Sequence, residues 1–178
     1  MAHVMVIAVG ADRPGIVAAV TGVLVEQGCN LEDTSMTILR GHFTMMLVVA
    51  LPPGGDPARL AGALAAAADA VDVDVRVLPI GEEVGRSPGG DPWTVSVYGA
   101  DRPGIVHGVA ALLAGLGVNI TDLTTRVAGP PEQPVYAMVL EVTVPPGVEA
   151  PDLERRLEAL AGGLGVECSL HPADADIL

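Results

Sequence analysis

Two copies of the sequence GADRPGIV contain the residues of this chain that are best suited to bind a small charged molecule. One copy begins at Gly10 and the other begins 89 residues later, at Gly99. In each copy an aspartate, an arginine, a proline and a glycine stand directly before a segment with helical periodicity. Proline suits the first helical position, because the amide hydrogen that it lacks would have no partner there. The pattern therefore predicts a turn that opens a helix, with the arginine of each copy as the cap residue.

The start of such a helix offers a binding site for an anion. Its first backbone amides have no acceptor within the helix, and they lie at the positive end of the helix dipole. A carboxylate is therefore stabilised there, and a glycine leaves room for it to approach. This chemistry fits an amino acid or another small acid. The candidate ligand-binding residues are Asp12, Arg13, Gly15, Ile16 and Asn30 in the first half of the chain and Asp101, Arg102, Gly104, Ile105 and Asn119 in the second.

A purely structural role for the repeated turn is the alternative. Asp12 and Asp101 can cap or brace their helices, and the glycines can permit a tight turn without any ligand. The turn also lacks the glycine spacing of a nucleotide-binding loop. His107 lies three residues after Gly104, where the first copy has Ala18. It can touch a ligand at the helix start or be an ordinary surface histidine.

The remaining side chains predict neither catalysis nor a metal site. The 4 histidines are scattered, and the chain has no HExxH or GxSxG motif and no cysteine–histidine pair at catalytic spacing. Its 2 cysteines, Cys29 and Cys168, are too few for a disulfide framework and lack the spacing of metal ligands. We therefore expect a protein without a cofactor, a metal ion or enzymatic activity.

The repeat extends well beyond the turn and determines the architecture. With the same offset of 89 residues Asn30 matches Asn119, and after an insertion around GPPEQ an offset of 93 residues matches Phe43 to Tyr136. A period of about 90 residues is the length of a small domain rather than of a solenoid repeat. The chain therefore contains two copies of one domain.

Each half shows the same order of predicted elements. Apolar runs at 4–9 and 94–98 predict first strands, and the helices after the turns carry apolar residues at positions i, i+4, i+7 and i+8. A glycine, Gly28 or Gly117, then fits the left-handed position after the helix. A second strand, a third strand that ends at a PPG turn, an Ala/Leu-rich helix and a fourth strand follow. This order predicts an α+β fold of two ferredoxin-like βαββαβ domains in tandem, each an antiparallel sheet with two helices on one face.

Composition divides the chain into four parts. Residues 1–80 form the first predicted domain, and residues 93–171 form the second. Residues 81–92 are rich in glycine, proline and charge, as linkers are, and residues 172–178 form an acidic tail that we expect to be frayed.

In the predicted fold the second strand of each domain starts at the end of the sheet opposite to the repeated turn. A site that uses both the turn and Asn30 or Asn119 therefore requires two domains to pair.

Charge and apolar content exclude several classes of protein. The chain has 22 acidic residues against 9 basic ones, a net charge of −13, and no basic stripe that could neutralise the phosphates of DNA or RNA. No apolar run approaches the roughly 20 residues that cross a membrane. No secretory signal is visible at the N-terminus. We therefore expect a cytoplasmic protein that binds neither nucleic acid nor membrane.

Both halves resemble the ACT domain, a small regulatory domain of amino-acid metabolism. The resemblance rests on VMVIAVGADRPGIVAAVTGVLVEQGCNLEDTSM and WTVSVYGADRPGIVHGVAALLAGLGVNITDLTT, and it covers about residues 3–80 and 93–171. A tandem pair of such domains is similar to the glycine cleavage system transcriptional repressor group. The resemblance implies that amino acids bind between paired domains, through the first loop and the start of the second strand, and that the protein forms dimers.

Three functions fit these observations. The first is a regulatory protein that senses an amino acid and controls glycine cleavage or other amino-acid metabolism through a protein partner, because its charge argues against direct contact with DNA. The second is an interaction or oligomerisation module that binds no ligand. The third is an accessory subunit of an enzyme, such as the deformylases or phosphoserine phosphatases that similar domains accompany.

Overall fold

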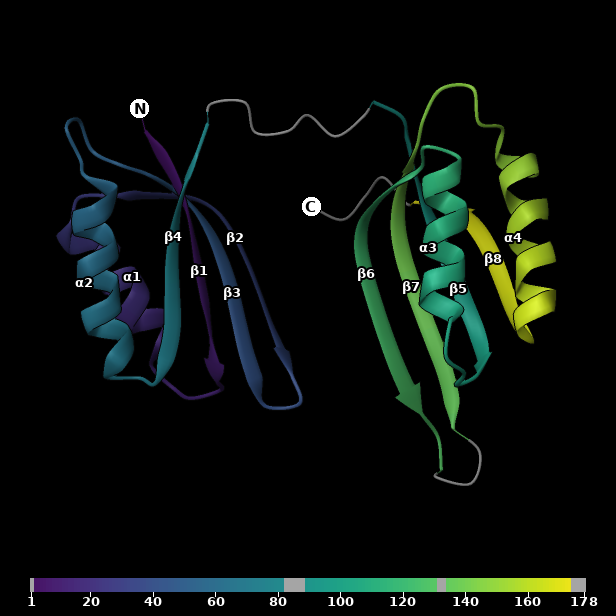
Figure 1. Cartoon of the computed structure of the whole chain (residues 1–178), viewed down its shortest axis with the longest axis horizontal. Coiled ribbons are helices and arrows are strands. Elements are labelled where there is room, and N and C mark those ends of the chain that lie inside the picture. Colours follow the sequence, from purple (N-terminus) through teal and green to yellow (C-terminus); the bar gives the residue numbers. More distant parts are fainter. Residues whose placement is uncertain (1, 82–88, 131–133, 174–178) are drawn as a thin grey trace. The chain divides into compact units, whose positions relative to one another are not determined.

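Two units of the same fold make up the structure, which is a computed structural model that describes residues 2–81, 89–130 and 134–173. The chain divides into the compact units Met1–Gly85 and Arg86–Leu178. Each contains an antiparallel four-stranded sheet with two helices on one face, in the order β-α-β-β-α-β (Figure 1). The predicted pair of ferredoxin-like α+β domains is therefore confirmed. Most of the predicted linker, residues 82–88, lies outside the described residues.

The two sheets have the same strand order, which places the first and third strands of each unit in the centre. The first sheet has the order β2-β3-β1-β4 and the second the order β6-β7-β5-β8. The elements of the first unit are β1 (His3–Ala11), α1 (Ile16–Glu26), β2 (Asn30–Leu39), β3 (His42–Ala50), α2 (Pro57–Asp69) and β4 (Val73–Ile80). Those of the second unit are β5 (Asp91–Ala100), α3 (Ile105–Gly115), β6 (Asn119–Ala128), β7 (Val135–Val144), α4 (Ala150–Leu164) and β8 (Val166–Pro172).

Alternating apolar residues build a separate core in each unit. In β1 the side chains of Val4, Val6 and Ala8 are fully buried, whereas the residues between them are partly exposed. No charged side chain of the described residues is buried. The predicted apolar face of the first helix is confirmed, because the buried residues of α1 are Ile16, Val20, Val23 and Leu24. Burial of apolar surface, at about 25 cal/mol per Å², therefore stabilises each unit around its own core.

Glycines end α1 and α3, as predicted. Gly28 and Gly117 directly follow the C-cap residues in the left-handed conformation, with φ angles of 67° and 71°. In the first unit the amides of Gly28 and Cys29 donate to the carbonyl oxygens of Val25 and Leu24. These carbonyls have no other partner at a helix end, so the pair of bonds stabilises the termination.

Replacing Gly28 by alanine should destabilise the first unit by about 1–2 kcal/mol, because a side chain makes the left-handed conformation costly. Space is not limiting, since a Cβ there would meet only Pro52 Cγ, at 4.0 Å. Gly22, inside α1 with open space at its Cβ, is the matched control. Alanine at Gly22 should stabilise the unit by about 0.5–1 kcal/mol. Urea unfolding should shift in opposite directions for the two variants, and a shift in one direction for both would contradict this account.

The second sheet begins earlier in the chain than the sequence predicts. β5 starts at Asp91, inside the predicted linker and before the predicted first strand residue, Thr94. The reason is a long-range contact, because Asp91 lies opposite Val144 of β7. Pro172, the first residue of the predicted tail, is the last residue of β8 and therefore belongs to the sheet.

Trp93 and Pro172 show how the ends of the second unit meet. Trp93 of β5 pairs with Pro172, the last residue of β8. The amide of Ala173 then donates to the carbonyl oxygen of Pro92, at 3.1 Å. The rest of the predicted tail, residues 174–178, lies outside the described residues.

Candidate functional site

In both units the repeated turn leads into a helix that no side chain caps. The N-cap of α1 is Gly15, in the left-handed conformation with a φ of 99°, and α3 begins in the same way after Gly104, with a φ of 96°. The prediction that Arg13 and Arg102 are the cap residues is therefore wrong. A positive φ at Gly15 and Gly104 places each glycine before its helix, so a Pro–Gly turn separates each arginine from the helix. Glycine adopts this left-handed conformation at little cost.

The backbone amides at the start of each helix are available to a ligand. The first helical hydrogen bond of α1 joins the Ala19 amide to the Gly15 carbonyl oxygen, and that of α3 joins the Gly108 amide to the Gly104 carbonyl oxygen, both at 2.8 Å. The amides of residues 16–18 and 105–107 consequently have no acceptor within their helices. An anion at either position would face these amides and the positive end of the helix dipole.

The glycine that opens each repeat is required by the last strand of its unit. A Cβ at Gly99 would lie 2.7 Å from Val166 Cγ1, and one at Gly10 would lie 2.8 Å from the carbonyl oxygen of Asp72. Contacts this short would force the strands apart. The first glycine of GADRPGIV therefore has a structural role, and it allows the last strand to start close beside the turn.

The arginines of the two turns have different surroundings. The Arg13 guanidinium forms an ion pair with the Asp72 carboxylate, at 2.9 Å. With the offset of 93 residues, the position of Asp72 corresponds to Gly165 in the second unit. A Cβ on Gly165 would lie 2.8 Å from Arg102 Nη1, so the arginine packs against a glycine there. No ion pair between described residues includes Arg102, whose charge is therefore not neutralised by them.

The turn of the second unit borders a hollow of about 560 Å³. The start of α3 forms one wall, and the neighbouring strands β6 and β7 contribute the others. Its lining residues are Asp101, Arg102, Pro103, Gly104, Ile105, Val106, His107, Thr125 and Tyr136. The structure therefore gathers the candidate residues of the second turn around one space. Because the Ile105 side chain is buried in the core, this residue offers only its backbone to a ligand.

Thr125 and Tyr136 are lining residues that the sequence prediction does not include. They come from paired strands, and sheet register rather than proximity in sequence brings them to the turn. A comparison of the two halves of the repeat could nevertheless have indicated these two residues. The matching positions in the first half are Met36 and Phe43, so both sites change from an apolar to a hydroxyl-bearing side chain between the two copies.

The Tyr136 hydroxyl stays protonated at neutral pH. Burial raises the pKa of this phenol above its ordinary value, and the nearby Asp101 carboxylate raises it further. The residue is only 7% exposed, so its ring belongs to the core while it also lines the hollow. A protonated phenol can donate and accept a hydrogen bond, which makes Tyr136 suited to a polar group of a ligand.

Asn30 and Asn119 lie at the other end of their sheets, as the fold predicts. Asn30 opens β2 and pairs with Ala50, the last residue of β3. The turn instead follows Ala11, which pairs with His42, the first residue of β3. The second sheet has the same arrangement, with Asn119 at the start of β6 opposite the end of β7. A single domain therefore does not bring its turn and its asparagine around one ligand.

Comparison with known proteins identifies both units. Residues 2–78 and residues 93–162 each match the ACT domain. The chain belongs to the ACT-domain family. An unknown protein from Galdieria sulphuraria has a crystal structure that matches this chain with a TM-score of 0.83 and 26% identity, covering 97% of this chain and 98% of that one. A solved structure therefore matches this chain along almost its full length.

Two named relatives differ in how much of their own length matches this chain. The chain is 24% identical to the glycine cleavage system transcriptional repressor of Escherichia coli, over 95% of this chain and 89% of the repressor. It is 31% identical over 157 residues to a phosphoserine phosphatase of Mycobacterium tuberculosis, a match that covers 83% of this chain. That match includes only 36% of the phosphatase, so the chain spans about a third of its length.

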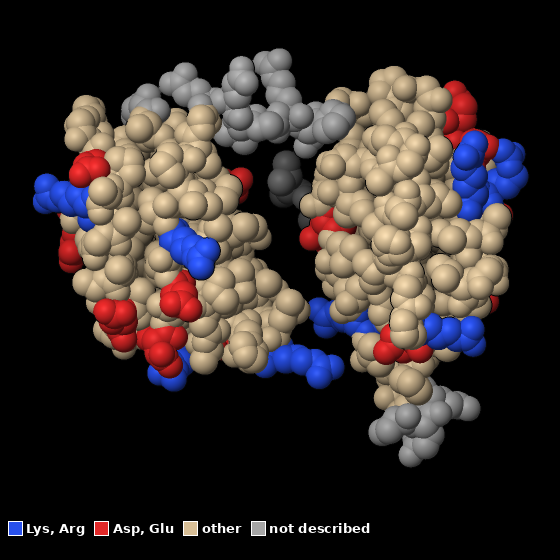
Figure 2. Space-filling model, viewed as in Figure 1, with Lys and Arg blue, Asp and Glu red and all other residues tan. Residues whose placement is uncertain are grey.

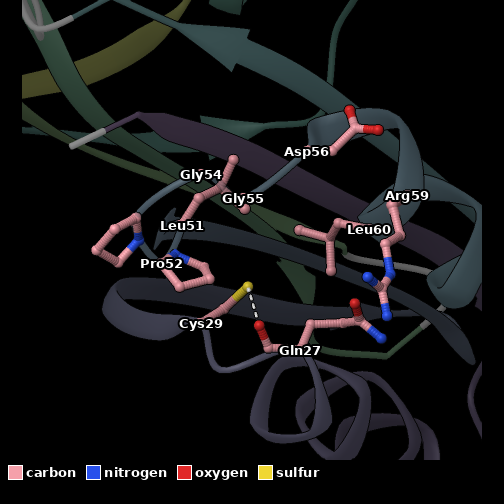
Figure 3. A pocket seen from close by; sticks show the side chains of 10 residues that line it. Gln27, Cys29, Leu51, Pro52, Gly54, Gly55, Asp56, Arg59 and Leu60 are labelled. Atoms are coloured by element: carbon pink, nitrogen blue, oxygen red, sulfur yellow. Dashed lines mark hydrogen bonds between the residues drawn. The ribbon is translucent and has the colours of Figure 1, made fainter.

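A smaller pocket lies beside the Asn30 end of the first ACT domain. It has a volume of about 210 Å³ and lies between the end of α1 and the start of α2 (Figure 3). Its polar lining residues are Gln27, Cys29, Asp56 and Arg59. The Cys29 thiol is 3.9 Å from the carbonyl oxygen of Gln27, and the Asp56 carboxylate caps α2. Both groups are thus already engaged within the domain.

Neither cysteine of the ACT domains is activated as a nucleophile. Burial raises the pKa of the Cys29 thiol. Burial, together with the carboxylates of Glu158 and Glu154, raises the pKa of Cys168 to about 11. The thiolate is the reactive form, and the surroundings of both thiols disfavour it.

Charged side chains are dispersed over the ACT domains. Figure 2 shows acidic and basic groups scattered over the visible face without a continuous basic surface. In the described ranges, no three His, Cys, Asp or Glu side chains are grouped so that they could hold a metal ion. Among the helices of the same residues, none has the length and apolar character to cross a membrane.

Proposed function

We propose that this chain is a regulatory protein that binds an amino acid or a similar small carboxylate. The observation that carries the proposal is the hollow of the second ACT domain, where three free helix amides and the Arg102 guanidinium face the same space. Guanidinium groups and helix N-termini both bind carboxylates, and they do so more strongly together than alone. Membership of the ACT-domain family supports a regulatory role.

A second ACT domain completes the site in this proposal. The turn and the asparagine of one domain lie at opposite ends of the sheet, so the asparagine that meets the ligand, Asn30 or Asn119, belongs to another domain. A ligand that binds only paired domains stabilises the pairing, because it shifts the population toward the state that it prefers. The ligand would thereby favour dimers, and the paired form would be the signal.

Control of transcription or metabolism then requires a protein partner. Similarity to the glycine cleavage system transcriptional repressor supports a role in controlling glycine cleavage or other amino-acid metabolism in the cytoplasm. The net charge of −13 opposes direct binding to nucleic acid, so the partner rather than this chain would contact DNA. The chain would have no catalytic activity of its own.

A thermal-shift screen of the purified protein against the twenty amino acids tests the proposal. A ligand that binds only the folded state should raise the melting temperature, and at 100 times its Kd it adds about 2.7 kcal/mol. We expect a saturable rise for a small subset of amino acids and a reduced rise in D12A D101A, in which the turn aspartates are replaced. No shift at millimolar concentrations would favour the alternative, an interaction module that binds no ligand. An unchanged shift in the double variant would refute the site.

A further inference from the structure

We infer that the two ACT domains have divided their roles: the second binds the ligand beside its turn, and the first does not. The hollow of the second domain fits a small carboxylic acid that carries a second hydrogen-bonding group, as amino acids with polar side chains do. This inference rests on the proposed function, and it adds which domain binds and what the ligand must contain.

The first reason is the charge beside the turn. In the first domain the Asp72 carboxylate already occupies the Arg13 guanidinium, at 2.9 Å, so a ligand carboxylate would have to displace it. In the second domain the uncharged Gly165 takes the place of Asp72 against Arg102. Arginine binds a carboxylate through two parallel N–H donors, and in the second domain no ion pair between described residues occupies those of Arg102.

The second reason is the polarity of the walls. Besides Asp101 and Arg102, three side chains of the second hollow can form hydrogen bonds with a ligand, and none of the counterparts of these three in the first domain can donate one. The pairs, given as the first domain against the second, are Ala18 and His107, Met36 and Thr125, and Phe43 and Tyr136. The second domain therefore recognises a polar group next to the carboxylate, whereas the first presents an apolar surface at the same place.

Tyr136 is the most informative of these side chains. Phe43, its counterpart, is 2% exposed and fills the core of the first domain without any polar group. A hydroxyl at such a position costs free energy unless it finds a partner. Tyr136 lines the hollow, so a ligand there can supply that partner. The tyrosine thus places a hydroxyl group beside the hollow, where the corresponding phenylalanine of the first domain offers none.

The exchange Gly165→Asp converts the second domain to the charge arrangement of the first. Asp72 has a φ of 55° and Gly165 a φ of 69°, so an aspartate can adopt the conformation required at this position. The nearest atom to the new Cβ is the flexible tip of Arg102, which can move. The introduced carboxylate should pair with Arg102, and the exchange replaces none of the residues that line the hollow. Asp72→Gly, which frees Arg13 in the first domain, is the matched control.

Isothermal titration with three pairs of similar amino acids tests the inference. The pairs are L-alanine and L-serine, L-valine and L-threonine, and L-leucine and L-asparagine. We expect one bound ligand per chain, with a polar member of a pair bound about tenfold more tightly than its apolar partner, as one added hydrogen bond implies. Tyr136→Phe should reduce that preference. Gly165→Asp should weaken binding by about tenfold or more, and Asp72→Gly should leave it unchanged.

The outcomes separate this inference from the proposed function. Two ligands per chain, tighter binding of the apolar members, or equal effects of Gly165→Asp and Asp72→Gly would overturn the division of roles while leaving an amino-acid-binding protein. Absence of binding by all twenty amino acids would refute the function itself. Far-UV circular dichroism and the melting temperature without ligand show that each variant is folded. Amide NMR shifts at residues 104–107, with none at residues 15–18, would support the assignment directly.

Discussion

Replacing Leu64 by alanine should lower the free energy of unfolding of the first ACT domain by about 2–5 kcal/mol and leave the second domain intact. Leu64 of α2 is fully buried in the core that contains Val4, Val6 and Leu47, and its loss removes apolar contacts and opens a cavity. The effect should stay local because the second domain has a core of its own, built around residues such as Leu157. Hydrogen exchange of backbone amides, followed by mass spectrometry, measures both domains in one sample.

Two controls define what this experiment shows. Leu157→Ala, at the corresponding position of α4, should reverse the pattern and destabilise only the second domain. Val25→Ala in α1 removes a side chain that is 77% exposed, and it should change the stability by no more than about 0.5 kcal/mol. If Leu64→Ala lowered amide protection equally in both domains, the domains would form a single cooperative unit and the account of two separate cores would be wrong.

Replacing Arg102 by methionine should weaken binding of the amino-acid ligand about 10- to 150-fold, the range expected when a hydrogen-bonded charge worth about 1.5–3 kcal/mol is removed. The guanidinium lines the hollow beside three free helix amides, and no ion pair between described residues includes it. Methionine keeps much of the apolar stem of the side chain, so the domain should still fold. Isothermal titration with the amino acid that gives the largest thermal shift measures the change in Kd.

Arg13→Met is the matched control for this variant. It removes the ion pair with Asp72, whose two side chains are 54% and 72% exposed, and such surface pairs contribute about 0–1 kcal/mol to stability. We expect the Kd of the ligand to change less than about twofold, because Arg13 does not take part in binding if the second domain alone binds. A Kd that weakened as much in Arg13→Met as in Arg102→Met would show that both turns bind ligand.

The internal repeat made most of the fold predictable from the sequence. Two copies of each strand and helix signal, in the same order, confirm one another, and the apolar spacing from Ile16 identified the buried face of α1 correctly. Gly28 and Gly117 were predictable as helix ends because glycine is favoured in the left-handed conformation that ends a helix. These are local properties, which a sequence expresses within a few residues.

The features that escaped prediction depend on long-range contacts or on backbone conformation. The start of β5 at Asp91 follows from its pairing with β7, some fifty positions away in the chain. The helix starts were misplaced because a Pro–Gly pair can stand inside a helix or before it. The positive φ of Gly15 shows that this pair stands before α1. Tyr136 reaches the turn only through the register of the sheet, so its position in the site could not be inferred from sequence spacing.

The positions of the aromatic residues have a practical consequence for every fluorescence experiment. The single tryptophan and both tyrosines, Tyr98 and Tyr136, belong to the second ACT domain, whereas the first contains only Phe43. Intrinsic fluorescence of the intact chain therefore reports on one half of the molecule. Melting of the first domain should be nearly invisible in the emission, while a ligand that contacts Tyr136 reaches one of the three emitting side chains. The chain thus has its own optical reporter in the domain that we infer to bind.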